Sequence, residues 1–135
     1  MTTFTAAPAT TTGRRAGSAR AARIGRWAAR LALSAQFVVG GVLKLTADPA
    51  MVAMFDDIGA GQGLRLFIGV CEVAGAIGLL VPRLDRLAAI GLVLLMIGAA
   101  VTNVVALQIS PAVPLVLLVL ATVVAVVPSR KGSGR

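Results

Sequence analysis

One acidic residue, Glu72, lies within a long apolar stretch of the sequence, residues 64–81. A carboxylate in such surroundings is costly unless a cation pairs with it or a proton neutralises it. In the preceding apolar stretch, Gln36, Gly40 and Lys44 recur every fourth residue, so they share one face of a helix. We therefore expect an ion pair between Lys44 and Glu72, with Gln36 below it.

The depth of these side chains in their helices supports the pairing. At about 1.5 Å per residue, Gln36 lies about 14 Å and Glu72 about 12 Å below the outer ends of their helices, and Lys44 only a few ångström below. Helical side chains lean towards the N-terminus of their own helix. Because the two helices run in opposite directions, Lys44 leans inwards and Glu72 leans outwards, and their charges converge.

Two interpretations of this polar group remain open. In the first, the ion pair, or a protonated Glu72 bonded to Gln36, only fixes the packing of the helices. In the second, the group is a polar site for a ligand or a proton. Asn103, with Thr102, either joins this group from a third apolar stretch or bonds the backbone of a neighbouring helix. The candidate ligand-binding residues are therefore Lys44, Glu72, Gln36 and Asn103.

The composition places these residues in a membrane protein. The chain has 135 residues, of which 58% are hydrophobic and 13% are charged, whereas soluble domains are roughly 45–50% apolar and about 25% charged. So small a soluble domain cannot bury that much apolar surface. One cysteine and no histidine allow no disulfide within the chain and no cysteine–histidine metal site, and the usual general base near neutral pH is missing. We expect no metal, and no catalysis by this chain alone.

Four apolar segments position the polar residues: 27–45, 64–81, 87–107 and 113–127. The first three have the length of about 17–25 residues that a membrane-spanning helix needs, and residues 110–112 bring the fourth into that range. Pro82 ends the second segment, Asp85 can cap the third, and Ser110 followed by Pro111 is typical of a helix start. Short connections make the later segments antiparallel neighbours. The sequence predicts an all-α fold, a membrane-spanning antiparallel four-helix bundle.

The longest connection, residues 46–63, contains a further helix signal. Asp48 followed by Pro49 is typical of a helix start. Apolar residues then recur at helical spacing, at Met51, Val52, Phe55 and Ile58. This pattern predicts a short amphipathic helix in the outer membrane interface. It lies above Lys44 and Glu72, where it is either a lid over the site or a shield for the helix ends.

The basic residues indicate the orientation of the bundle. Eleven of the 13 Lys and Arg residues fall on the side that holds both termini. They are Arg14, Arg15, Arg20, Arg23, Arg26, Arg30, Arg83, Arg86, Arg130, Lys131 and Arg135. This asymmetry is the positive-inside pattern, so we expect a plasma-membrane protein with both termini in the cytoplasm. A cleaved signal peptide is the alternative for segment 27–45, although its apolar run continues past the faint cleavage signal at residues 32–35.

The apolar segments and the basic ends divide the chain into three regions. Residues 1–26 form a basic cytoplasmic tail, expected to be flexible and to become helical towards its end. Residues 27–128 form the transmembrane domain, and residues 129–135 form a second basic tail. One helical face carries an anchor for the interface: Arg23, Trp27 and Arg30. Because few aromatic residues accompany these arginines, we expect anionic lipid headgroups as their partner, and no nucleic acid.

A series of short motifs runs along the chain: Arg30, GGVLKL at 40–45, Asp48-Pro49, Phe55 with Ile58-Gly59, GVCE at 69–72 and GAIGLLVP at 75–82. Over about residues 26–127 the chain thus resembles the DoxX-like family of small four-helix membrane proteins. The resemblance implies an inner-membrane protein, some of whose relatives are linked to quinone-reducing oxidoreductases or to redox-stress complexes. It also implies that Lys44 and Glu72 are family-like polar positions. Because this chain has only one cysteine, a thiol–disulfide mechanism within the subunit is excluded.

These observations lead to one functional hypothesis and two alternatives. The hypothesis is an accessory subunit of a membrane redox or stress-response system, with a membrane oxidoreductase as partner and a quinone-like ligand beside Glu72. Quinones need polar partners for their carbonyls and an apolar slot for their tail. The alternatives are a structural or assembly protein and a small-solute transporter. Against a transporter, four helices enclose little space unless the chain forms an oligomer, and the sequence shows no pair of broken helices.

Overall fold

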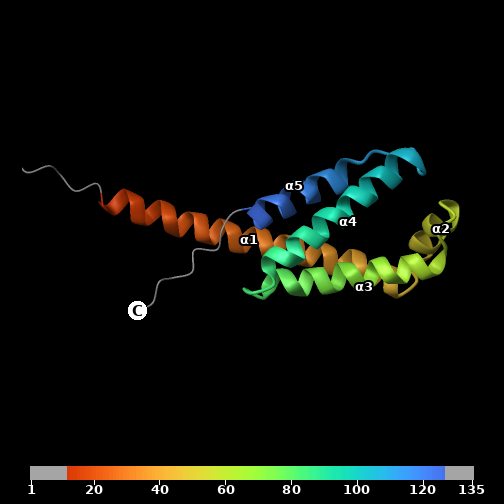
Figure 1. The fold of residues 1–135 in the computed structure, drawn as a ribbon, viewed down its shortest axis with the longest axis horizontal. Helices are drawn as coiled ribbons and strands as arrows, with labels where there is room; N and C mark the ends of the chain where they lie inside the picture. Colours follow the sequence, from red (N-terminus) through yellow and green to blue (C-terminus); the bar gives the residue numbers. More distant parts are fainter. Residues whose placement is uncertain (1–11, 127–135) are drawn as a thin grey trace, which may run out of the picture.

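The computed structural model describes residues 12–126, which form five α-helices and no strand (Figure 1). The helices are α1 (Thr12–Leu45), α2 (Pro49–Asp57), α3 (Gly61–Leu80), α4 (Asp85–Val105) and α5 (Ala112–Val126). The predicted all-α fold is confirmed. The four predicted apolar segments correspond to α1, α3, α4 and α5, and α2 is the short helix expected in the longest connection.

Several helix boundaries follow the predicted start and stop signals. The Asp48 carboxylate accepts the backbone N–H of Ala50 at 3.1 Å, and Pro49 is the first residue of α2. Before α5, the hydroxyl oxygen of Ser110 accepts the first backbone N–H of that helix at 3.3 Å. α3 ends just before Pro82, whose ring disfavours helical backbone in the preceding residue.

α1 begins at Thr12, earlier than expected. The composition of residues 1–26 predicts a flexible tail that becomes helical towards its end, whereas residues 12–26 continue the apolar helix without a break. Alanine and arginine are good helix formers, and the extension of an existing helix needs no new nucleus. Residues 1–11 and the predicted tail at 129–135 lie outside the described part of the chain.

The helices pack in two pairs. α1 lies along α3, and α4 lies along α5, while contacts between α3 and α4 and between α1 and α5 join the pairs. Residues 81–84 connect α3 to α4 at one end of the molecule, here called the turn end. At the opposite end, called the α2 end, the α4–α5 pair diverges from the α1–α3 pair (Figure 1).

The hydrophobic core lies towards the turn end. Its members come from all four long helices: Leu33, Phe37, Ala76, Leu79, Ala89, Leu92, Met96, Ala121 and Val124. Small residues bring α3 close to both of its neighbours, as is common between membrane helices. A Cβ atom added at Gly41 would lie 2.9 Å from the carbonyl oxygen of Gly69, and one added at Gly78 would lie 2.7 Å from the Cβ of Ala88.

Much of the outer surface is apolar. The exposed fractions of Phe67, Leu87, Leu94 and Val105 are 63, 69, 65 and 73%. Among the described residues, α1 from Gly17 onwards, α3 and α4 are long and apolar enough to cross a membrane, and α5 is a shorter apolar helix of 15 residues. Long helices with apolar side chains on all sides are typical of a multi-pass membrane protein in contact with lipid.

Candidate functional site

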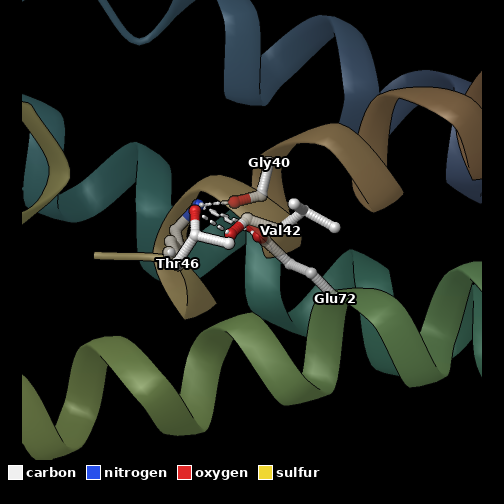
Figure 2. A network of polar contacts seen from close by, with 5 residues as sticks. Gly40, Val42, Thr46 and Glu72 are labelled. Atoms are coloured by element: carbon white, nitrogen blue, oxygen red, sulfur yellow. Dashed lines mark hydrogen bonds and ion pairs between the residues drawn. The ribbon is translucent and has the colours of Figure 1, made fainter. Parts of the chain in front are cut away.

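The predicted pairing of Lys44 with Glu72 is present (Figure 2). The ammonium nitrogen Nζ of Lys44 lies 3.1 Å from Oε1 and 3.0 Å from Oε2 of Glu72, so both carboxylate oxygens accept from it. Lys44 also donates to the backbone carbonyl of Gly40 at 3.4 Å. In Figure 2, Glu72 reaches from α3 towards Gly40 on α1. The ion pair therefore joins α1 to α3.

This ion pair is almost entirely enclosed. Glu72 is 5% exposed, and the side chain of Lys44 is 13% exposed. A carboxylate buried to this degree requires a cation at hydrogen-bond distance. Gly40 leaves room for it, because a Cβ atom at this position would lie 3.3 Å from Oε2 of Glu72. The two adjacent glycines thus differ: Gly41 allows α3 to approach, and Gly40 makes space for the carboxylate.

A cavity of about 560 Å³ lies beside the ion pair. Its walls come from all five helices and are mostly apolar. Lys44 and Glu72 lie in the wall formed by α1 and α3, and Phe37 and Met96 of the core also line it. No Cα atom of α1 lies within 8 Å of one in α4. The cavity thus occupies the space between the two diverging helix pairs.

All four candidate ligand-binding residues line this cavity: Gln36, Lys44, Glu72 and Asn103. The structure therefore brings together side chains from α1, α3 and α4. Gln36 is exposed, and its side chain makes no hydrogen bond to another residue within 12–126. Of the two pairings considered for Glu72, the one with Lys44 is present and the one with Gln36 is not.

Asn103 and Thr102 line the cavity and also bond to backbone. The side-chain amide of Asn103 donates to the carbonyl oxygen of Ser110 at 3.3 Å, and the Thr102 hydroxyl donates to the carbonyl oxygen of Gly98 at 3.0 Å. Of the two alternatives stated for these residues, the first is realised, because both line the cavity. The backbone partners do not belong to a neighbouring helix: Gly98 lies in α4 itself, and Ser110 lies in the connection from α4 to α5. The Oδ1 oxygen of Asn103 accepts no hydrogen bond from the described residues.

A second buried ion pair, between Arg30 and Asp85, was not predicted. Arg30 is 4% and Asp85 7% exposed, and the Arg30 guanidinium lies 5.6 Å from the centroid of the Trp27 ring. Asp85 is the first residue of α4 and accepts the N–H of Arg86, whereas the N-cap position that it was expected to fill belongs to Leu84. The signal was an arginine and an aspartate expected at the same membrane face.

Arg65 is likewise buried, at 5% exposed. Its Nε donates to the side-chain oxygen of Gln62. The Nε2 atom of Gln62 donates in turn to Oδ1 of Asp56 at 2.7 Å and to the carbonyl oxygen of Val52 at 3.3 Å. This chain of contacts joins α3 to α2. Gln62 and Arg65 lie one helical turn apart on α3, whereas Asp56 and Val52 belong to α2, so helical periodicity does not predict the contacts between the two helices.

The polar side chains that line the cavity carry one amine, one carboxylate, one hydroxyl and two amides, in apolar surroundings. Within residues 12–126, no three His, Cys, Asp or Glu side chains gather as a metal site. Cys71 is half-buried and free, and it lines a separate apolar groove between α3 and α4. The cavity beside the Lys44–Glu72 pair, apolar with a few polar side chains, suits a lipophilic molecule that carries few polar groups.

A comparison with known protein families covers the residues of this site. The sequence model of the DoxX-like family matches residues 28–126, a range that includes the cavity and both ion pairs. No curated protein and no solved structure matches the chain.

Proposed function

The chain belongs to the DoxX-like family, and from this membership and the geometry of the cavity we propose that it is an accessory subunit of a membrane redox or stress-response system. In this role it binds a lipid-soluble, quinone-like ligand beside Glu72. Its partner is a membrane oxidoreductase, which carries out the electron transfer.

One observation supports this proposal most directly: the cavity is apolar except for a small polar group in its walls. A quinone needs hydrogen-bond donors for its carbonyl oxygens and an apolar slot for its tail. Lys44 and the amide of Gln36 are donors. Glu72 and Oδ1 of Asn103 are acceptors for the hydroxyl groups of the reduced form. The apolar remainder of the cavity is the slot.

The proposal includes an orientation in the plasma membrane. α1, α3, α4 and α5 cross the bilayer as an antiparallel four-helix bundle, with the turn end and both termini in the cytoplasm. Arg30, Arg83 and Arg86 lie at the turn end, as the positive-inside pattern requires. The 15 residues of α5 reach about 22 Å, which a bilayer accommodates by local thinning. α2 then lies in the outer interface.

A purely structural role is the second candidate, because the ion pair is satisfied without any ligand. Both oxygens of Glu72 already bond to Lys44, as expected of a contact that fixes helix packing. Under this alternative, Lys44→Met and Glu72→Gln each lower the amount of protein in the membrane, and the double variant restores it. The reason is that an unpaired buried charge destabilises more than the loss of the whole pair.

A binding experiment on the double variant separates the two functions. Quinones are extracted from the purified protein and identified by mass spectrometry, and a decyl-benzoquinone is titrated into protein in lipid nanodiscs. We expect the double variant Lys44→Met/Glu72→Gln to be normally abundant and to bind the probe at least about tenfold more weakly than the wild type. Cys71→Ser is the matched control, because its side chain lines a different groove. The absence of saturable binding by the wild type would overturn the proposal.

A further inference from the structure

α2 covers the cavity with four apolar side chains, Met51, Met54, Phe55 and Ile58. Phe55 is only 3% exposed. The backbone of α2 approaches α3 and the end of α1, but no Cα atom of α2 lies within 8 Å of one in α4 or α5. α2 therefore closes one side of the cavity without being packed between the two helix pairs.

Both connections of α2 contain backbone in the left-handed region. Ala47, which precedes the helix, has a φ of 56°, and Gly59 and Gly61, which follow it, have φ values of 67° and 73°. A Cβ atom at either glycine would meet nothing within 4 Å. Backbone conformation, and not close packing, is therefore the reason for glycine at these positions. Loop and element-terminal residues of this kind absorb the changes in φ and ψ when an element pivots.

Among the described residues, the side-chain hydrogen bonds between α2 and α3 come from one residue. Gln62, on the first turn of α3, donates to Oδ1 of Asp56 and to the carbonyl oxygen of Val52. Its own oxygen is held by the buried Arg65 guanidinium, so the Gln62 amide is oriented from the α3 side. Asp56 is exposed, and water competes there for its oxygens. The contact can therefore break without unfolding either helix.

We propose that α2 is a lid, which pivots about Ala47 and about Gly59 and Gly61 and opens the cavity when the hydrogen bond between Gln62 and Asp56 breaks. The identity of what enters rests on the proposed function, because a lipid-soluble ligand in the cavity is covered on one side by α2. The pivoting of α2 does not rest on it, and it is measured without a ligand.

Two spin labels report the position of the lid. In a Cys71→Ser background, one label replaces Ala53, which is exposed on α2, and the other replaces Val105, which is exposed at the end of α4. Distances between the labels are measured in lipid nanodiscs with no ligand added. We expect a main population at one distance, the closed lid, and a smaller population at a longer distance, the open lid.

Three variants test whether the contact between Asp56 and Gln62 controls the population at the longer distance. Asp56→Ala removes the acceptor and is expected to enlarge the open population about three- to tenfold. Asp56→Asn keeps an acceptor oxygen, and Asp57→Ala removes a neighbouring exposed charge whose side chain makes no hydrogen bond or ion pair in the described residues. Both are expected to behave as the wild type does. The same distance distribution in all four proteins would overturn the proposal.

Ligand kinetics keep this test apart from that of the proposed function. In Asp56→Ala, association and dissociation of the decyl-benzoquinone are expected to accelerate by a similar factor, because the lid affects both steps. If the wild type binds no quinone while the labels report opening, the ligand proposal fails and the lid is supported. If quinone binds and the labels report one unchanging distance, the lid is refuted and the ligand proposal is supported.

Discussion

Two buried ion pairs connect α1 to other helices, and they differ in how visible they were in the sequence. Glu72 is the one acidic residue in its apolar stretch, so the sequence predicts a cation beside it, and Lys44 is the candidate within reach. Arg30 and Asp85 instead lie near the ends of apolar segments, where charged side chains usually meet water or headgroups. Their burial depends on where the fold places the start of α4 relative to α1, which local sequence does not show.

We predict that the pair at the turn end contributes strongly to stability. Asp85→Asn removes the charge that faces the buried Arg30 guanidinium, and loss of one partner of a buried pair typically costs about 3–5 kcal/mol. The midpoint of thermal unfolding in detergent should therefore fall. Asp57→Asn, which neutralises an exposed aspartate, is the control and should leave the midpoint unchanged. Equal midpoints for the two variants would contradict a stabilising pair.

A second prediction concerns the closest approach of α1 to α3. In Gly41→Ala the new methyl group would lie 2.7 Å from Cγ2 of Val73 as well as close to the α3 backbone. Such overpacking costs about 1–3 kcal/mol. Gly63→Ala adds the same methyl group on α3 where nothing lies within 4 Å, and alanine favours a helix over glycine. Thermal unfolding should show a loss for Gly41→Ala only; a loss in both would point to a general intolerance of alanine.

At the scale of the elements, short-range signals predicted most of the helices. The Asp48-Pro49 start of α2 and the Ser110 contact before α5 involve residues only a few positions apart. Both partners of each contact can therefore be recognised in a short stretch of sequence. The start of α1 was predicted less well. Its basic portion lacks the apolar pattern on which the boundary was based, whereas the helix continues because of backbone propensity.

The conformation of the first hinge leads to a prediction for α2. Left-handed backbone costs a non-glycine residue about 1–2 kcal/mol, so Ala47→Gly should stabilise the closed position of α2. Ala53→Gly, in the middle of the same helix, should instead destabilise it by about 0.5–1 kcal/mol. Amide hydrogen exchange of α2 should therefore slow in the first variant and accelerate in the second. A change of the same sign in both would argue against strain at Ala47.

At the scale of the whole molecule, the divergence of the two helix pairs creates the cavity. The core lies towards the turn end and leaves the α2 end open, so the polar side chains of α1, α3 and α4 face a common space. The candidate residues could be named from their types and depths. Only the arrangement of all the long helices shows that Gln36 and Asn103 face the same cavity as the ion pair. It also shows that Gln36 does not bond Glu72.

The proposed orientation predicts which surfaces react from outside the cell. In a Cys71→Ser background, a membrane-impermeant maleimide should label Asp57→Cys in intact cells, because that residue is exposed at the α2 end. Arg83→Cys, exposed at the turn end, should react only after the membrane is permeabilised. The opposite pattern would reverse the orientation, although it would leave the cavity as described.

The sequence alone determined the all-α membrane class of the protein and most of its helices, and it predicted the Lys44–Glu72 pair. The length of an apolar segment, the helix caps and the recurrence of polar residues at every fourth position all depend on residues that are close together in the chain. Only the tertiary structure decided that the cavity exists, that Arg30 meets Asp85 and that Gln62 holds α2. These features depend on the angles at which helices cross, and those angles result from packing among side chains far apart in the sequence.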